Sequence, residues 1–134
     1  MRIVLDTNVL IAAFIARGLC SRLLEHCFER HELFTSEFIM DELSNNLVGK
    51  FHVNPNDVAA ALDLLQSKMQ TVTPVALKTP ICRDPEDDMI LATALAAGAA
   101  CIITGDKDLT GLKRLETIDI LSPTDFIDYE SRRP

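Results

Sequence analysis

The sequence predicts an α/β fold in which helices cover both faces of a central parallel sheet. Short runs at residues 2–5 and 100–103 are apolar without the alternation of a half-exposed strand, which is typical of strands buried on both faces, and residues 118–121 give a last short strand. Segments of helical composition separate these runs, and this order favours parallel βαβ units. The length of 134 residues is that of one domain with one core, so we expect a single domain over residues 1–134.

Capping residues and glycines set the expected bounds of the helices. Polar residues suited to accept hydrogen bonds from a first helical turn stand at Asp6, Ser21, Ser36, Asn54 and Ser122. Pro55 and Pro123 occupy first helical positions, where proline is favoured. Glycines are expected to end helices at Gly18, Gly49 and Gly98. The expected helices are therefore 9–16, 21–31, 36–49, 55–68, 86–97 and one that begins at 122–123.

Two more strands and one loop complete the expected order. Residues 33–35 and 71–75 are apolar or β-branched runs between helical segments, which indicates strands. Residues 78–85 hold two prolines and are expected to form a loop. The alanine-rich segment 86–97 is the best helix of the chain.

Composition excludes several classes of protein. The longest apolar run, 92–103, is too short to span a bilayer, and Asp6 interrupts the N-terminal apolar stretch too early for a secretory signal. We therefore expect a cytoplasmic protein that does not enter a membrane. The formal net charge of -7 argues against capture of nucleic acid by the whole surface. A nucleic acid must then be bound locally, through metal or through a small basic patch, for which the candidates are Arg17, Arg22, Lys107, Lys113 and Arg114.

The cysteines and histidines show no zinc-binding spacing. None of the four cysteines belongs to a C-x-x-C pair, and the three histidines add no recognisable pattern. We expect reduced, mostly buried thiols. A dinucleotide-binding module is also disfavoured, because Asp-Thr-Asn follows the first strand and no G-x-G-x-x-G is present.

Acidic residues follow the predicted strands in a way that indicates a common site. Asp6 and Asp106 each come directly after or close to the end of a buried strand, and the carboxyl ends of parallel strands share one edge of the sheet. Asp87 lies in the first turn of helix 86–97, which must run antiparallel to the following strand and so begins at that same edge. Glu42 lies within helix 36–49, and spacing alone does not fix its position.

Converging carboxylates favour metal-assisted chemistry. They repel one another and raise their own pKa values unless a cation neutralises them, and oxygen ligands select hard ions such as Mg²⁺ and Mn²⁺. Such ions activate water and stabilise a phosphodiester during in-line attack. Each acid alone also has a purely structural explanation as a cap, a helix-dipole partner, a solvated residue or a turn residue. Only the four acids taken together indicate metal-assisted hydrolysis.

Four segments in order resemble the PIN-domain family. They are residues 3–10, Ile-Val-Leu-Asp-Thr-Asn-Val-Leu; 36–43, which begins with serine and ends in Glu-Leu; 87–94, followed by Gly98; and 102–109, Ile-Ile-Thr-Gly-Asp-Lys-Asp-Leu. The resemblance implies a three-layer α/β/α sandwich. It also implies a catalytic, metal-binding set of Asp6, Glu42, Asp87 and Asp106, supported by Asn8, Thr104 and Asp108. Counting back from Gly98 places the third acid at Asp87, while Asp84 and Asp88 remain alternatives.

Residues 83–88 and 104–106 resemble more closely the toxins of toxin-antitoxin systems, the VapC-type ribonucleases. This resemblance implies an endoribonuclease that uses Mg²⁺ or Mn²⁺ to hydrolyse RNA. It also implies a homodimer and an antitoxin protein that holds the enzyme inactive. Two alternatives stay open: a phosphohydrolase or DNA-directed nuclease with the same acids, and a catalytically silent PIN-like module that binds RNA or a partner protein. The presence of all four acids disfavours the silent module.

Overall fold

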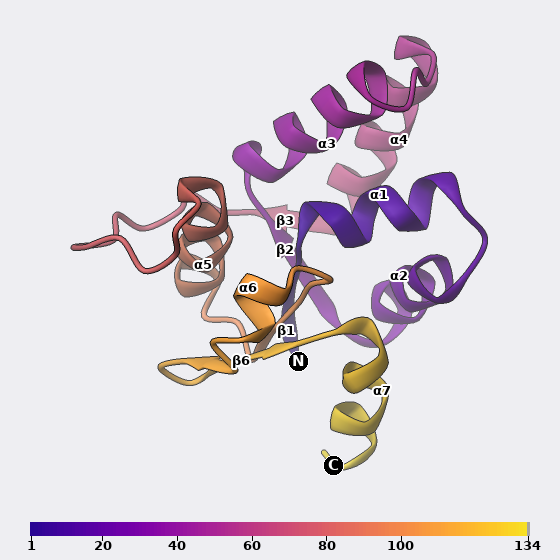
Figure 1. Ribbon diagram of the computed structural model, residues 1–134. Helices are drawn as coiled ribbons and strands as arrows, with labels where there is room; N and C mark the ends of the chain where they lie inside the picture. The colour runs from indigo at the N-terminus through magenta and orange to yellow at the C-terminus, as the bar shows by residue number, and fades with distance from the viewer. Residues whose placement is uncertain (134) are drawn as a thin grey trace.

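The computed structural model describes residues 1–133 and contains a six-stranded sheet with helices on both faces (Figure 1). The strand order is β3-β2-β1-β4-β6-β5, and only β5 runs antiparallel to its neighbour. The strands are β1 (Arg2–Leu5), β2 (Glu32–Thr35), β3 (Met69–Thr71), β4 (Cys101–Ile103), β5 (Arg114–Leu115) and β6 (Ile118–Leu121). The helices are α1 (Thr7–Ile15), α2 (Leu19–Arg30), α3 (Glu37–Gly49), α4 (Pro55–Lys68), α5 (Pro85–Ala97), α6 (Lys107–Thr110) and α7 (Pro123–Ser131). The predicted α/β class with a central, mostly parallel sheet is confirmed.

The layers form because the central strands are apolar on both sides. Ile3, Val4 and Ile102 are fully buried, and every residue of β1 and β4 except Arg2 is buried. Helix α5 packs on β1 and β2 from one side, while α1, α2 and α7 lie on the other side (Figure 1). Helix α3 packs against α1 and α4, and its amino end lies near α5 (Figure 1).

The chain adds strands first to one side of β1 and then to the other side. From β1 it proceeds outward to β2 and β3, and then returns to place β4 on the opposite side of β1. Connections therefore leave these two strands in opposite directions, which opens a crevice outside their carboxyl ends. Leu5 pairs with Ile103 in the register, and the backbone N–H of Asp6 donates to the carbonyl oxygen of Ile103 at 2.9 Å. The residues that follow the two strands are thus held side by side.

Most of the expected caps are present, and one is wrong. The side chains of Asp6, Ser36, Asn54 and Ser122 each accept a hydrogen bond from the first turn of the helix that follows. Helix α2, however, begins at Leu19 behind Gly18, and Ser21 lies inside it. Cys20, which precedes the serine, packs against the core at helical spacing from the buried Leu23 and Cys27, and this accounts for the earlier start.

The third strand also differs from its expected place. β3 covers Met69–Thr71 rather than 71–75, because Met69 is buried and pairs with Leu33, while Thr71 pairs with the last residue of β2. Helix α6 and strand β5 were not predicted, because they are too short to show a periodic pattern. The antiparallel β5 makes the sheet mixed rather than wholly parallel.

The cysteines match the expectation of reduced, mostly buried thiols. All four are free, Cys27 and Cys101 are buried, and Cys20 and Cys82 are half-buried. Within residues 1–133, no single helix combines the length and apolar composition needed to cross a bilayer, although α1 and α2 meet that test jointly as a pair bent by 109°.

Candidate metal centre

Asp6 lies at the carboxyl end of β1 and is held by three hydrogen bonds. Its Oδ1 accepts from the backbone N–H of Thr7 at 2.6 Å, and its Oδ2 accepts from the Thr104 hydroxyl at 2.6 Å and from the Asn8 amide at 3.2 Å. Asn8 in turn accepts from the backbone N–H of Gly105 at 3.1 Å. Asn8 and Thr104 therefore tie the end of β1 to the loop after β4 and fix the orientation of the Asp6 carboxylate.

Asp106 stands on the loop after β4 and caps the short helix α6. Its backbone N–H donates to Thr104 Oγ1 at 3.0 Å, and its Oδ1 accepts from the backbone N–H of Asp108 at 2.8 Å. Carboxylate oxygens of Asp87, Asp106 and Asp108 lie within 4.8 Å of one another. Asp108 is exposed and forms an ion pair with Arg83 at 3.2 Å. Asp108 thus lies at the outer border of the acidic group.

The acids at the start of α5 have separate positions. Asp84 caps the helix by accepting from the backbone N–H of Glu86 at 2.9 Å. Asp87 is buried on the helix face that also holds the buried Ile90. Asp88 turns to the preceding loop, where it accepts from the backbone N–H of Cys82 at 2.8 Å. Of the three aspartates considered in the sequence, Asp88 is therefore directed away from the site, while Asp87 and Asp84 face it.

One pocket of about 240 Å³ collects the predicted acids. Asp6, Glu42, Asp87 and Asp106 all line it, and Asp84 and Glu86 add two further carboxylates. Glu42 reaches the pocket from α3, an element whose approach the spacing of the sequence left undetermined. The structure thus brings the four acids together at the carboxyl edge of the sheet, where β1 and β4 end.

The sequence analysis missed Asn46, Lys50 and Glu86 as lining residues of this pocket. Asn46 and the C-cap residue Lys50 follow Glu42 by four and eight residues, a helical spacing that aligns the three side chains along α3. That spacing was the available signal. Lys50 is the basic residue that lines the pocket, whereas the earlier candidate Arg22 lines a different pocket beside α7. Arg114, another candidate, is paired with Asp119 at 3.3 Å.

Burial and mutual repulsion raise the pKa values of the clustered acids. Burial, the charge of Asp106 and a hydrogen bond with Asp106 raise the pKa of Asp87 to about 7. Burial also raises the pKa of Asp6, although the hydrogen bonds from Thr104 and Thr7 act in the opposite direction. The pKa of Glu42 is raised by burial, with neighbouring Glu86 adding to the effect. The protein therefore holds several carboxylates where their charge is unfavourable.

The donor chemistry of the pocket fits a hard divalent cation. Its acids offer only oxygen ligands, which suit Mg²⁺ or Mn²⁺ better than softer metals. A dication among them would offset the repulsion that raises their pKa values. The three hydrogen bonds to Asp6 leave its carboxylate about one free acceptor position for such an ion, because an ionised carboxylate offers about four acceptor sites.

Comparison with known proteins identifies the family. The PIN domain model matches residues 2–108, so the chain belongs to the PIN domain family. An uncharacterized protein of Methanocaldococcus jannaschii is 30% identical over 142 residues, covering 96% of this chain and 90% of that protein.

Solved structures share the fold at lower sequence identity. A chain of VapBC2 from Rickettsia felis, a complex bound to a DNA fragment from its promoter, has a TM-score of 0.66 and 17% identity and covers 91% of this chain and 98% of its own. A chain of VapBC-1 from nontypeable Haemophilus influenzae has a TM-score of 0.64 and 21% identity, with 92% and 99% coverage. These similarities support the PIN-like α/β fold.

We expect Asp106→Asn to melt at a higher temperature than the parent in the presence of a chelator. Asparagine caps a helix about as well as aspartate, so the variant keeps α6 while it loses one of the repelling charges. Mn²⁺ should then raise the melting temperature of the parent more than that of the variant, because binding to the folded site stabilises by mass action. Thermal melts of both proteins in chelator and in Mn²⁺ measure the two effects.

Asp63→Asn is the matched control for this melt. Asp63 is exposed within α4 and does not line the pocket, so the change alters net charge by the same amount. If Asp106→Asn and Asp63→Asn respond equally to Mn²⁺, Asp106 does not contribute to a metal centre.

Proposed function

We propose that this protein is an endoribonuclease that uses Mg²⁺ or Mn²⁺ to hydrolyse RNA phosphodiester bonds. The observation that carries the proposal is the convergence of Asp6, Glu42, Asp87 and Asp106 on one pocket at the crevice between β1 and β4. Membership of the PIN domain family supports a nuclease. In this proposal the four acids are the catalytic, metal-binding set, with Asn8 and Thr104 as positioning residues and Asp108 at the border.

The residues of the pocket have distinct tasks in this proposal. A bound Mg²⁺ or Mn²⁺ supplies an activated water and neutralises charge on the scissile phosphate. Asp6 is oriented by Thr104 and Asn8 before any ligand binds, so its position costs little reorganisation. Lys50 brings a positive charge to a pocket otherwise rich in carboxylates and is placed to pair with a substrate phosphate. Local charge of this kind is required, since the net charge of -7 does not attract RNA.

We also propose that the protein is the toxin of a toxin-antitoxin pair and acts as a homodimer. The support is the likeness of its fold to chains of VapBC complexes from Rickettsia felis and Haemophilus influenzae. An antitoxin would hold such a nuclease inactive until it is removed. Co-purification of the chain with a small protein encoded by a neighbouring gene would support this part of the proposal.

Asp6→Asn should abolish most of the metal-dependent cleavage of a labelled single-stranded RNA. The amide has the same shape as the carboxylate but is a poor ligand for a hard cation, so we expect a loss of at least about a hundredfold. The assay compares parent and variant with Mn²⁺ and with chelator. Asp63→Asn, with the same change of charge outside the pocket, should retain parental activity.

Two outcomes of that assay would contradict the proposal. Cleavage by Asp6→Asn within about twofold of the parent would remove Asp6 from the metal centre. A parent that binds RNA but cuts none with Mn²⁺ or Mg²⁺ would favour the catalytically silent binding module.

The three aspartates at the start of α5 should differ in their effect on activity. Asp87→Asn is expected to impair cleavage most, because Asp87 lies in the pocket beside Asp106. Asp88→Asn should preserve activity to within a few fold, because Asp88 binds the backbone of residues 81 and 82 instead. Asp84→Asn should also have a small effect, since asparagine can replace it as the cap of α5. Initial rates at saturating Mn²⁺ rank the variants, and a larger loss for Asp88→Asn would reverse the assignment.

A further inference from the structure

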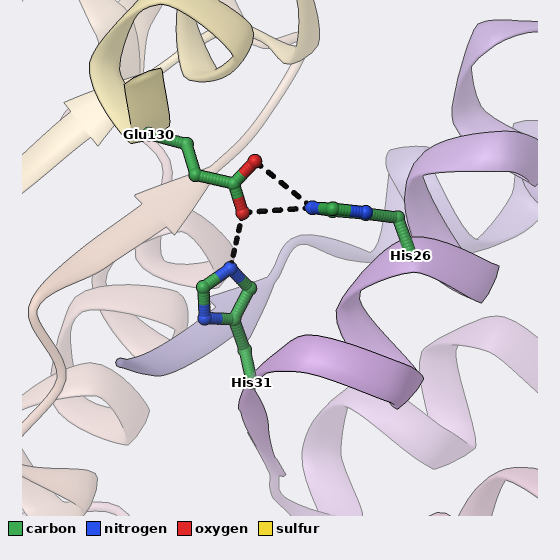
Figure 2. Close-up of side chains that lie close together, drawn as sticks. All are labelled: His26, His31 and Glu130. Carbon is green, nitrogen blue, oxygen red and sulfur yellow. Dashed lines mark hydrogen bonds and ion pairs between the residues drawn. The ribbon is translucent and has the colours of Figure 1, made fainter. Parts of the chain in front are cut away.

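A second group of metal-ligand side chains lies between α2 and α7 (Figure 2). His26 comes from α2, His31 follows the last residue of α2, and Glu130 comes from α7. Figure 2 shows both imidazole rings directed at the same carboxylate. The pocket lined by His26 and Glu130 shares no residue with the acidic pocket, so this group is independent of the proposed nuclease site.

The ligand atoms of the three side chains converge on one point. His26 Nε2 is 2.8 Å from Glu130 Oε2 and 2.9 Å from Oε1, and His31 Nε2 also contacts Oε2. One ligand atom from each residue lies within 4.8 Å of the others. In a tetrahedral zinc site with bonds of about 2.0 Å, neighbouring ligand atoms are about 3.3 Å apart. Widening the His26–Glu130 contact from 2.8 Å by roughly half an ångström reaches this spacing, and His31 must also draw back from the carboxylate.

The donor set is one that zinc and related dications use. Two imidazole nitrogens and one carboxylate, with a fourth position left for water, form a recognised zinc ligand set. Burial alone would raise the pKa of Glu130, but its hydrogen bonds with His31 and His26 lower it below the ordinary value. The carboxylate is therefore in its anionic, ligating form.

The surroundings orient the ligands and leave a path for an ion. The His31 side chain is 10% exposed, and its ring packs edge-on against Phe126 with centroids 6.0 Å apart. Its Nδ1 lies 3.2 Å from the amino nitrogen of Met1, a contact that holds the ring in the metal-free protein. The His26 side chain is 40% exposed and, with Glu130, borders a pocket of about 260 Å³ through which an ion and a water can enter.

We propose that His26, His31 and Glu130 form a binding site for a transition-metal dication of the zinc class, which fastens α7 to α2. The bound ion replaces the hydrogen bonds among the three side chains with coordinate bonds from the same Nε2 and carboxylate oxygen atoms. Each coordinated imidazole then carries its hydrogen on Nδ1. On His31 this hydrogen takes the place of the contact that Nδ1 makes with the amino nitrogen of Met1.

The test is a titration of chelator-treated, full-length protein with Co²⁺, whose visible absorption reports imidazole ligation. Excess Mg²⁺ is present throughout to occupy the oxygen ligands of the acidic pocket. We expect the parent to bind one Co²⁺ per chain at the histidine site and Zn²⁺ to displace it. His26→Gln should weaken binding at least about tenfold, because even residues that only support a metal ligand typically matter by that factor. His26 is half-exposed and glutamine is a good helix former, so the variant should stay folded.

Two further variants make the result specific. Glu130→Gln keeps the size of the side chain and removes its charge, so it should weaken Co²⁺ binding as His26→Gln does. His52→Asn removes an exposed histidine whose left-handed backbone asparagine tolerates, and it should bind like the parent. Zn²⁺ should raise the melting temperature of the parent and of His52→Asn, but raise that of His26→Gln and Glu130→Gln less.

The proposal is overturned if the parent binds no Co²⁺ at this site, or if His26→Gln and Glu130→Gln bind Co²⁺ with parental affinity and absorption. The three side chains would then form a hydrogen-bonded contact between α2 and α7 only. RNA cleavage is not measured in this test, so its result bears on the histidine site alone and not on the proposed nuclease site.

Discussion

The register between β1 and β4 is the constraint on which the acidic site depends. Leu5 lies beside Ile103, so the residues that follow them leave the sheet as neighbours. Thr104 can then donate to Asp6 at 2.6 Å and accept from the backbone of Asp106 at 3.0 Å. A slip of one residue would turn the side chains of β4 to the opposite face and break this chain of hydrogen bonds. The buried, apolar faces of both strands oppose such a slip, and the packing of the core thereby fixes the geometry of the site.

Repulsion among the carboxylates of the acidic pocket destabilises the folded protein, and the same carboxylates favour binding of a cation. Asp6 and Asp87 are buried beside Asp106, and the pKa of Asp87 is raised to about 7. The apolar core around β1, β4 and α5 holds these groups in place despite their repulsion. In our proposal a divalent cation relieves this repulsion when it binds. Metal binding therefore raises the free energy of unfolding.

Parts of this arrangement were predictable from sequence because they depend on strand ends. Asp6 and Asp106 follow β-branched runs, and the glycine after α5 set the direction in which Asp87 returns to the sheet edge. Glu42 could be predicted as a site residue only from the resemblance of its segment to a family motif, because no local signal fixes how α3 approaches the sheet edge. Ser21 was wrong as a cap because α2 begins two residues earlier, where Cys20 already packs against the core.

The group formed by His26, His31 and Glu130 could not be predicted from the sequence. Glu130 is 104 and 99 residues away from the two histidines, and they meet only because α7 packs on α2. Long-range placement of this kind has no local periodic signal.

The most direct test of the central claim is a crystal structure of the protein soaked in Mn²⁺, with the ion located by its anomalous scattering. We predict Mn²⁺ in the pocket, coordinated by carboxylate oxygens of Asp6 and Asp106 and by Asp87 or Glu42. Mn²⁺ bound only by Asp87, Asp106 and Asp108, with Asp6 left outside the coordination sphere, would contradict a metal centre built on the junction of β1 and β4.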